Sequence, residues 1–270
     1  MKVAVISASL LISSPIVLAE IKLSGEIKQG GLLLGKTSPD NKVTLDGVKL
    51  TVSINGDFVF GFGRDDESTH QLRIVNPQGE TEEKTLKPAK RDYKIQRIEG
   101  IAKKIMSPDP KAVARAKKDS GQVRQARSNL SKQSAFAQGF IAPSKGIITG
   151  VYGSQRFYNG KPKSPHYGLD YAGKTGDAVK APADGTVILY VADMFYSGGT
   201  MIIDHGQGIT SSFLHLSKSY VKAGEKIKKG QVVAAIGSSG RATGPHLDWR
   251  INWFQVRLDP ALVLKVLPLN

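Results

Sequence analysis

Four of the five histidines of this 270-residue sequence lie between residues 166 and 246, close to several carboxylates. The sequence contains no cysteine, which excludes a thiol nucleophile, a thiolate metal site and a disulfide scaffold. Any metal ion would therefore be bound by histidine nitrogen or carboxylate oxygen, both of which are ligands of zinc. This histidine-rich segment is the first candidate for a chemical site.

The first candidate pair in this segment is His166 and Asp170, four residues apart. Pro165 and Gly168 favour a loop that leads into a strand over a helix. Both side chains can still converge on one ion, because histidine nitrogen and carboxylate oxygen approach zinc to about 2.0–2.2 Å. Such a pair also occurs in purely structural roles, so the pair alone does not decide between the two.

Residues 246–253 alternate polar and apolar side chains with a period of two, which predicts a strand with one buried and one polar face. The polar positions are His246, Asp248, Arg250 and Asn252, and the apolar positions are Leu247, Trp249, Ile251 and Trp253. The polar face either lines a site or meets solvent. The adjacent histidine and aspartate favour a site.

The remaining histidines are harder to assign from the sequence. His215 stands between two leucines at the end of a predicted strand, where it is either a core residue or part of a site. His205 precedes a glycine turn, and we expect it to be structural. His70 follows the acidic residues 65–67; a metal site there is conceivable, but we expect a solvated histidine.

The elements that must position these residues are strands. From residue 140 onward, short apolar runs separated by Gly, Pro and Asp turns are typical of an all-β barrel or sandwich. The runs cover Thr186–Ala192, Thr200–Ile203, Ile209–Leu216 and Val232–Ile236.

Residues 21–86 also show a pattern of strands and tight turns. Asn55-Gly56 predicts a hairpin, and further turns are expected at Asp46-Gly47 and at residues 76–79. We therefore predict a mainly β protein that begins, over residues 20–90, with a small β-sandwich without catalytic residues.

Residues 91–139 carry many lysines and arginines and few apolar residues, and Pro108 and Pro110 offer a helix start. We expect a basic, partly helical linker that extends into solvent. The whole chain has 38 basic and 23 acidic residues, a formal charge of +15. This excess favours an anionic partner, which is a nucleic acid, a membrane surface or a cell-wall polymer.

The N-terminal residues indicate which of these partners the protein meets. Residues 1–19 have Lys2, an apolar run to Val17 and Ala19 before an expected cleavage point, which is typical of a secretory signal peptide. No later apolar stretch approaches the roughly 18 residues of a membrane span. We expect a periplasmic or secreted protein without an integral membrane segment, whose anionic partner is the cell wall and not nucleic acid.

Residues 147–262 resemble the catalytic domain of the lysostaphin/LytM-type peptidoglycan zinc metalloendopeptidases. The matching motifs are, in order, His166-Tyr-Gly-Leu-Asp170, Ala181-Pro-Ala-Asp-Gly185, Asp204-His-Gly206, His215-Leu-Ser217, Gly237-Ser-Ser-Gly240 and Thr243-Gly-Pro-His246. The resemblance implies a LytM-type peptidase domain over residues 140–270, with a β-sheet, barrel-like fold of the duplicated hybrid motif type. It also implies hydrolysis of the peptide cross-links of peptidoglycan.

The same resemblance implies roles for single residues. His166 and Asp170 are the implied zinc ligands, and His215 and His246 are the implied catalytic pair that does not bind the metal. The family has a histidine as its third ligand, and this sequence has Asp248 at that position. The implied zinc site is therefore His166, Asp170 and Asp248.

This departure leaves two functions open. Arg250 shares the polar face with Asp248 and is able to pair with it instead of the metal. A non-catalytic wall-binding or amidase-activating protein on the same fold is then the alternative. Four of the five implied site residues are present, so we favour an active metalloendopeptidase.

Overall fold

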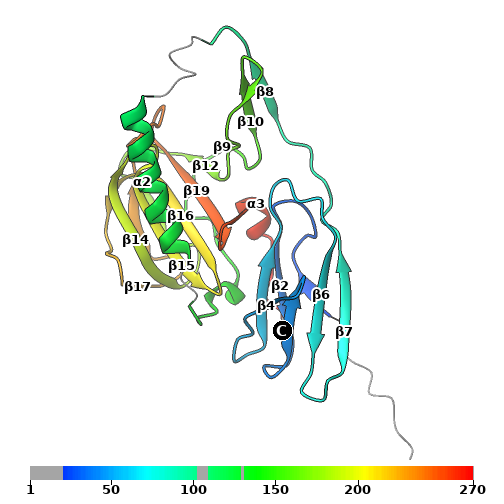
Figure 1. Cartoon of the computed structure of the whole chain (residues 1–270). Helices are drawn as coiled ribbons and strands as arrows, with labels where there is room; N and C mark the ends of the chain where they lie inside the picture. Colours follow the sequence, from blue (N-terminus) through cyan, green and yellow to red (C-terminus); the bar gives the residue numbers. More distant parts are fainter. Residues whose placement is uncertain (1–20, 102–108, 129–130, 270) are drawn as a thin grey trace, which may run out of the picture.

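Two β-rich units make up most of residues 21–101, 109–128 and 131–269, which a computed structural model describes (Figure 1). The predicted signal peptide, residues 1–19, lies outside the described residues. The mainly β prediction is confirmed. Among the described residues, no helix has the length and apolar character needed to cross a membrane.

The N-terminal unit is a sandwich of two sheets, with strand orders β1-β2-β5 and β4-β3-β6-β7. The strands are β1 (Leu23–Ser24), β2 (Leu32–Lys36), β3 (Lys42–Leu45), β4 (Val48–Leu50), β5 (Asp57–Gly61), β6 (His70–Val75) and β7 (Thr81–Leu86). Large apolar side chains of both sheets share one core, including Leu33 and Phe60 from one sheet and Val43 and Leu72 from the other. Burial of these faces is the main force that holds the sandwich together.

The turns of this sandwich only partly match the sequence prediction. Asp46 and Gly47, both at positive φ, join β3 to β4 as a two-residue hairpin. The hairpin predicted at Asn55-Gly56 is wrong, because β4 pairs with β3 whereas β5 pairs with β2. The turn at Asn55-Gly56 instead carries the chain from one sheet to the other.

The C-terminal unit is built on one large sheet with the main strand order β17-β14-β15-β16-β19-β12-β9. Its strands are β9 (Ile148–Gly150), β12 (Leu169–Ala172), β13 (Ala178–Lys180), β14 (Gly185–Met194), β15 (Gly198–Gly206), β16 (Ile209–Ser219), β17 (Lys226–Ile227), β18 (Val232–Ile236), β19 (His246–Trp253) and β20 (Val256–Leu258). The four apolar runs predicted as strands are β14, β15, β16 and β18. Strand β18 pairs with β13 and β16, and β20 pairs with β19.

The alternation predicted for residues 246–253 governs how β19 sits in this sheet. Leu247, Trp249 and Ile251 are fully buried in the core. The opposite, polar face of β19 is turned toward a cleft that Arg250 and Asn252 help to line. One strand therefore anchors the sheet and supplies a row of polar side chains.

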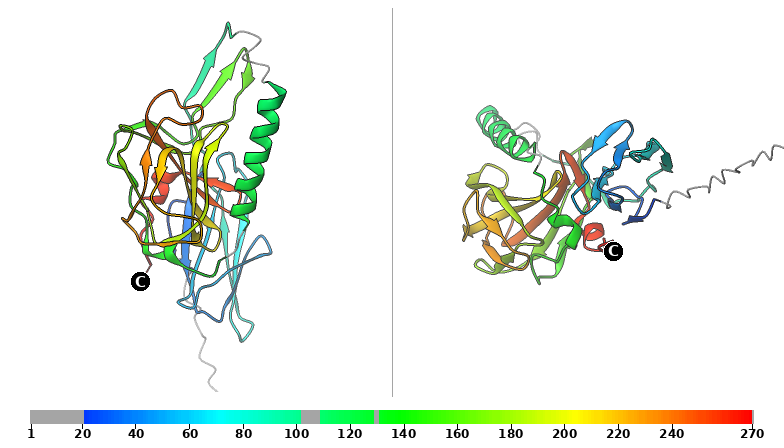
Figure 2. Two further views of the ribbon diagram at one scale, coloured as in Figure 1. Left: turned by 90° about the vertical axis from the view of Figure 1, so that its left-hand side faces the viewer. Right: turned by 90° about the horizontal axis from the view of Figure 1, so that it is seen from below.

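The basic segment between the two units packs on the C-terminal unit. Strand β8 (Ile95–Ile98) pairs in parallel with β10 (Gln155–Tyr158), which pairs with β11 (Lys161–Pro162). Helix α2 (Pro110–Arg127) begins at the predicted Pro110, with Asp109 as its N-cap, and packs on β14 and β15. Figure 2 shows α2 along one side of the sheet. The prediction of an arm that extends into solvent is wrong for this helix.

The sandwich is also packed against the C-terminal unit. Leu32, Leu34 and Val59 of the sandwich belong to the same buried cluster as Leu258 and Val263 of the C-terminal unit. The residues after β20 form α3 (Pro260–Val263), and the chain also has a short 3-10 helix, η1 (Ala135–Gln138). These contacts fix the sandwich beside the end of β19 that lies away from His246.

Candidate metal centre

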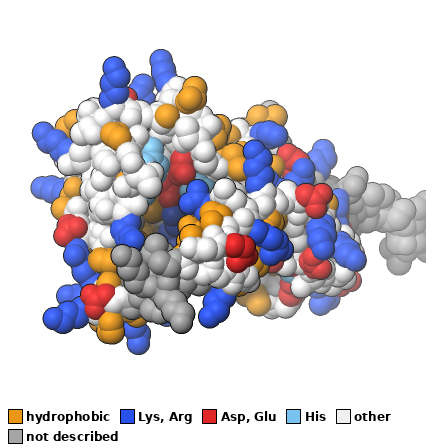
Figure 3. All heavy atoms as spheres, turned by 90° about the horizontal axis from the view of Figure 1, so that it is seen from above, with side chains coloured by type: hydrophobic (Ala, Val, Ile, Leu, Met, Phe, Trp, Pro, Cys, Tyr) orange, Lys and Arg blue, Asp and Glu red, His pale blue; other side chains and the backbone are white. Residues whose placement is uncertain are grey.

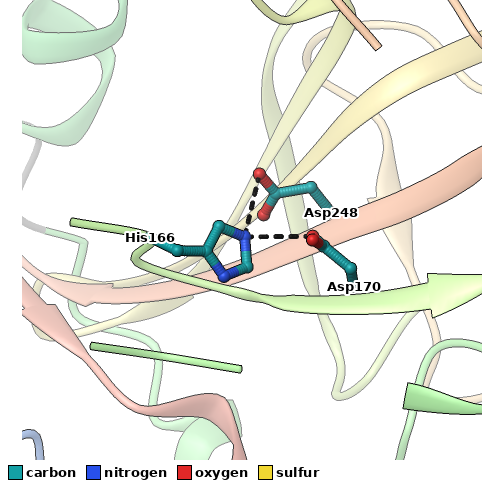
Figure 4. A group of neighbouring side chains, drawn as sticks. All are labelled: His166, Asp170 and Asp248. Atoms are coloured by element: carbon teal, nitrogen blue, oxygen red, sulfur yellow. Dashed lines mark ion pairs between the residues drawn. The ribbon is translucent and has the colours of Figure 1, made fainter. Parts of the chain in front are cut away.

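Two antiparallel strands and one loop bring three of the predicted ligands together (Figure 4). Asp170 on β12 and Asp248 on β19 are directly paired across the sheet. His166 reaches them from the loop before β12, with its Nε2 atom 3.0 Å from Asp170 Oδ1 and 3.6 Å from Asp248 Oδ2. One potential ligand atom from each residue lies within 4.8 Å of the other two.

The ring of His166 is oriented for this role by a backbone carbonyl. Its Nδ1 atom donates a hydrogen bond to the Val151 carbonyl oxygen at 3.1 Å, which turns Nε2 toward the carboxylates. Histidine ligands of metals are commonly held by such a bond through their second nitrogen. The orientation of His166 therefore fits a metal ligand.

The donor atoms also have the spacing and the unmet bonding capacity that a metal ion would use. His166 Nε2 and Asp170 Oδ1 are buried and have no hydrogen-bond partner, although they are 3.0 Å apart. Four bonds of about 2.1 Å in a tetrahedron separate ligand atoms by about 3.4 Å. The distances of 3.0 and 3.6 Å lie on either side of this value. The three residues therefore fit a zinc ion.

Two glycines make room for the carboxylates. A Cβ atom at Gly150 would lie 2.1 Å from Asp170 Oδ2, and one at Gly168 would lie 2.2 Å from Asp248 Oδ1. No side chain tolerates such distances without movement of the carboxylate. The glycine of the His166–Asp170 motif is thus required by packing against Asp248, a residue distant in the sequence.

Asp248 differs from Asp170 in having Arg250 as a second partner. Arg250 Nε donates to both of its carboxylate oxygens, at 3.0 and 3.1 Å, and Arg250 Nη2 donates to Oδ2. Burial disfavours the charged carboxylate, but Arg250 and His166 outweigh burial and hold the pKa of Asp248 well below its ordinary range. Asp248 is therefore a buried, charged residue in an ion pair with Arg250, as the sequence had left open.

His166 responds to the same carboxylates. Burial alone would lower its pKa, but Asp170 and Asp248 outweigh burial and raise the pKa of His166 to about 10 in the metal-free protein. The carboxylates thus create a strongly cation-attracting point at Nε2. A proton occupies this point when no metal does.

His215 and His246 form a separate pair beside the metal cluster, with ring centroids 4.7 Å apart. His215 Nδ1 donates to the Ser239 carbonyl at 2.9 Å, and His246 Nδ1 donates to the Gly244 carbonyl at 2.8 Å. These bonds leave both Nε2 atoms available. His215 has a φ of 63°, a left-handed conformation that costs a non-glycine residue on the order of 1–3 kcal/mol.

The other two histidines lie elsewhere. His205 is completely buried between the Asp184 carbonyl and the Ser211 hydroxyl, both at 2.7 Å, as expected for a structural residue. His70 is not solvated as predicted, because its ring lies between the carboxylates of Asp46 and Asp66. The contact of His70 with Asp46 was not predictable from local patterns, because Asp46 lies in the turn between β3 and β4, 24 residues before His70.

A cleft of about 480 Å³ extends from His215 along the sheet. Its walls come from β14–β16, from β19 and from α2. Figure 3 shows histidine, acidic and basic side chains side by side at the floor of a hollow on this face of the molecule. Sequence analysis missed the contribution of α2, because most of the residues that this helix brings to the cleft are polar.

The match of residues 164–260 to peptidase family M23 places this geometry in a known context. Residues 164–260 are similar to peptidase family M23. The matched segment, called the M23 domain below, contains the His166–Asp170 motif, the histidine pair and Asp248. The predicted resemblance is confirmed.

One solved structure and two curated relatives are also similar to this chain. A crystal structure from Pseudomonas aeruginosa described as a peptidase M23 is 27% identical, with a TM-score of 0.69, and the match covers 89% of this chain and 96% of that one. An uncharacterized metalloprotease of Haemophilus influenzae is 41% identical over 88 residues, which are 33% of this chain and 18% of the relative. The peptidoglycan DD-endopeptidase ShyA of Vibrio cholerae is 36% identical over 122 residues, 45% of this chain and 28% of ShyA. The matched segments thus span less than a third of either curated relative, whereas the structural likeness includes the sandwich.

Proposed function

We propose that this protein is a zinc-dependent endopeptidase that hydrolyses peptide cross-links of peptidoglycan during cell-wall remodelling. One observation carries the proposal. Three potential ligands, His166, Asp170 and Asp248, converge within 4.8 Å beside a histidine pair in an M23 domain. The name of the similar ShyA protein supports peptidoglycan as the substrate class.

His166, Asp170 and Asp248 would hold the zinc ion. Zinc bound there would polarise the scissile carbonyl and make a water molecule more acidic. Two carboxylates and a neutral histidine carry a charge of −2, and the cation of Arg250 reduces the total to −1. Arg250 thereby limits how far a second carboxylate weakens the Lewis acidity of the metal.

His215 and His246 would act on the proton and on the charge that develops during hydrolysis. Their carbonyl-bound Nδ1 atoms fix the rings and leave Nε2 to accept a proton from water or, once protonated, to donate to the oxyanion. Burial lowers the pKa of His215, so this imidazole is neutral near pH 7 and suited to accept a proton. We assign His215 as the base and His246 as the oxyanion donor.

Export and domain organisation complete the proposal. A signal peptide over residues 1–19 would deliver the protein to the periplasm or the cell surface, where the charge of +15 favours an anionic wall. We keep the division into a sandwich at 20–90, a basic segment at 91–139 and a peptidase domain at 140–270. Peptidoglycan, and not nucleic acid, is the proposed partner.

A second candidate function has its own observation. Arg250 already binds both oxygens of Asp248, and a metal must compete for the same carboxylate. If Arg250 wins this competition, the protein is a non-catalytic wall-binding or amidase-activating module.

Incubation of the mature protein with purified sacculi separates the two candidates. We expect new peptide ends in the presence of zinc, none with a chelator and none with His246→Ala. If the wild type is inactive at every zinc concentration while Asp248→His releases peptides, the non-catalytic function is correct.

A further inference from the structure

Arg127, the last residue of α2, is a buried arginine whose charge no described carboxylate neutralises. Its side chain lines the cleft and the residue is only 9% exposed. Nη2 donates to the Ser212 hydroxyl at 2.8 Å, but Nε is buried without any hydrogen-bond partner. A guanidinium in this state is costly to bury, because neither its charge nor its donors are fully compensated.

Other positive charges lie near Arg127. Burial, together with the charges of Arg250 and Arg257, lowers the pKa of Arg127 to about 9, so the side chain remains a cation at neutral pH. Asn252, also in the cleft lining, has a buried Nδ2 donor without a partner. Helix α2 and strand β19 thus each bring to this end of the cleft a lining residue with a buried donor that has no partner.

The acidic groups nearby are already engaged. Asp248 is paired with Arg250, and the side chain of Asp119, the one carboxylate among the described residues that line the cleft, accepts the Phe195 amide at 2.7 Å. The donors at Arg127 and Asn252 therefore lack an anionic acceptor. A bound molecule with a negative charge would supply such an acceptor.

The position of these donors relates them to the metal centre. Ser212 and Thr210 on β16 pair with Arg250 and Asn252 on β19, which lie two and four residues beyond Asp248. At about 3.4 Å per residue, these positions lie about 7–14 Å along the strand from Asp248. An extended peptide spans this distance with about two to four residues.

We propose that Arg127, Ser212 and Asn252 form a subsite that binds a carboxylate of the peptide substrate two to four residues from the scissile bond. The proposal rests on the proposed function insofar as the ligand is a peptide. A carboxylate matches the guanidinium in charge and in its capacity for parallel hydrogen bonds. The basic segment before the M23 domain thereby contributes a specificity-determining residue to the cleft.

A titration that does not depend on hydrolysis tests the subsite. The probes are N-acetyl-D-alanyl-D-alanine with a free carboxylate and the same peptide as its C-terminal amide, titrated calorimetrically into the full chain with a chelator present. We expect the wild type to bind the acid at least about 10-fold more tightly than the amide, and Arg127→Met to lose this preference. Lys117→Met removes one charge from an exposed position of α2 outside the cleft lining, and it should keep the preference.

Thermal unfolding separates binding from a structural role. Because Arg127 is buried with an uncompensated charge, Arg127→Met should melt at the same or a higher temperature than the wild type. The acid peptide should raise the Tm of the wild type but not that of the variant. A large decrease of Tm in Arg127→Met would mark the guanidinium as structural and overturn the proposal.

Two further outcomes would also overturn it. One is a wild type without preference for the acid over the amide, and the other is acetate that binds as tightly as the acid peptide, which would indicate a general anion site. The chelated titration reports on the subsite alone, and the sacculus assay reports on hydrolysis alone. Failure of the proposed function therefore leaves a carboxylate preference measurable.

Discussion

Asp170 and Asp248 stand directly opposite each other on the neighbouring antiparallel strands β12 and β19. Like charges in this arrangement destabilise a sheet unless other groups compensate them. Here His166 lies against both carboxylates and Arg250 pairs with one of them. The pairing of two carboxylates explains why the site attracts cations. Variants that remove one of the charged groups test how the charges are balanced.

Removal of Arg250 should destabilise the metal-free protein and increase its dependence on zinc. The side chain of Asp248 is 4% exposed, and loss of one partner of a buried ion pair costs about 3–5 kcal/mol. Zinc supplies a replacement positive charge, so its addition should raise the Tm of Arg250→Met more than that of the wild type. Denaturant unfolding with and without zinc measures both effects, and equal zinc shifts in the two proteins would refute the compensating role.

Replacement of the histidine pair should abolish catalysis without loss of metal. Each of His215→Ala and His246→Ala is expected to reduce peptide release about 100- to 10,000-fold, because general acid–base groups contribute rate factors of this size. Zinc content, measured by metal analysis after dialysis, should match the wild type. Loss of zinc from either variant would place that histidine among the ligands instead.

Gly150→Ala should weaken metal binding through Asp170. The added Cβ would lie 2.1 Å from Asp170 Oδ2, so the carboxylate must move, and displacement of a ligand by its surroundings typically lowers metal affinity about 10- to 100-fold. Competition with a fluorescent zinc chelator measures the affinity. Gly121→Ala in α2 is the control, because a Cβ atom added there would meet no atom within 4 Å. Similar zinc affinities of the two variants would contradict the packing argument.

The stability contribution of His70 should be lost as the pH rises. Burial lowers its pKa, but Asp46 and Asp66 outweigh burial and raise the pKa above its ordinary value. Because the folded-state pKa is raised, the contribution is fully present below the unfolded value of about 6.5. It disappears as the pH passes through the raised folded-state value.

The measurement is the difference in free energy of unfolding between the wild type and His70→Gln at several pH values. We expect a difference on the order of 1 kcal/mol at pH 6 that shrinks toward pH 9. A difference that grows with pH would show that His70 is held in its neutral form.

Local patterns predicted much of the site. The period of two in residues 246–253 identified both faces of β19, and Pro165 and Gly168 correctly indicated a loop before β12. Both features depend on short stretches of chain, where side-chain spacing directly determines the geometry. The set of three converging residues was implied by the family resemblance, because Asp248 reaches His166 and Asp170 only through the pairing of β12 with β19.

Contacts between distant segments were not predictable in the same way. Periodicity does not show that β4 and β5 belong to different sheets, so the turn at Asn55-Gly56 was misassigned. The sparse apolar residues of α2 suggested a solvated arm, but Arg115 and Asp119 hold this helix to the β14–β15 region through polar contacts. Because α2 packs there, Arg127 at its end lines the cleft.

The packing of the sandwich against the M23 domain has a consequence for how the protein unfolds. Arg91 of the segment after the sandwich pairs with the buried Asp259 at 2.8 Å, and Asp259 also caps α3 by accepting the Ala261 amide. Leu32 and Val59 share a core with Leu258. Neither unit can open without exposing apolar surface of the other, so the two should melt cooperatively in a single transition.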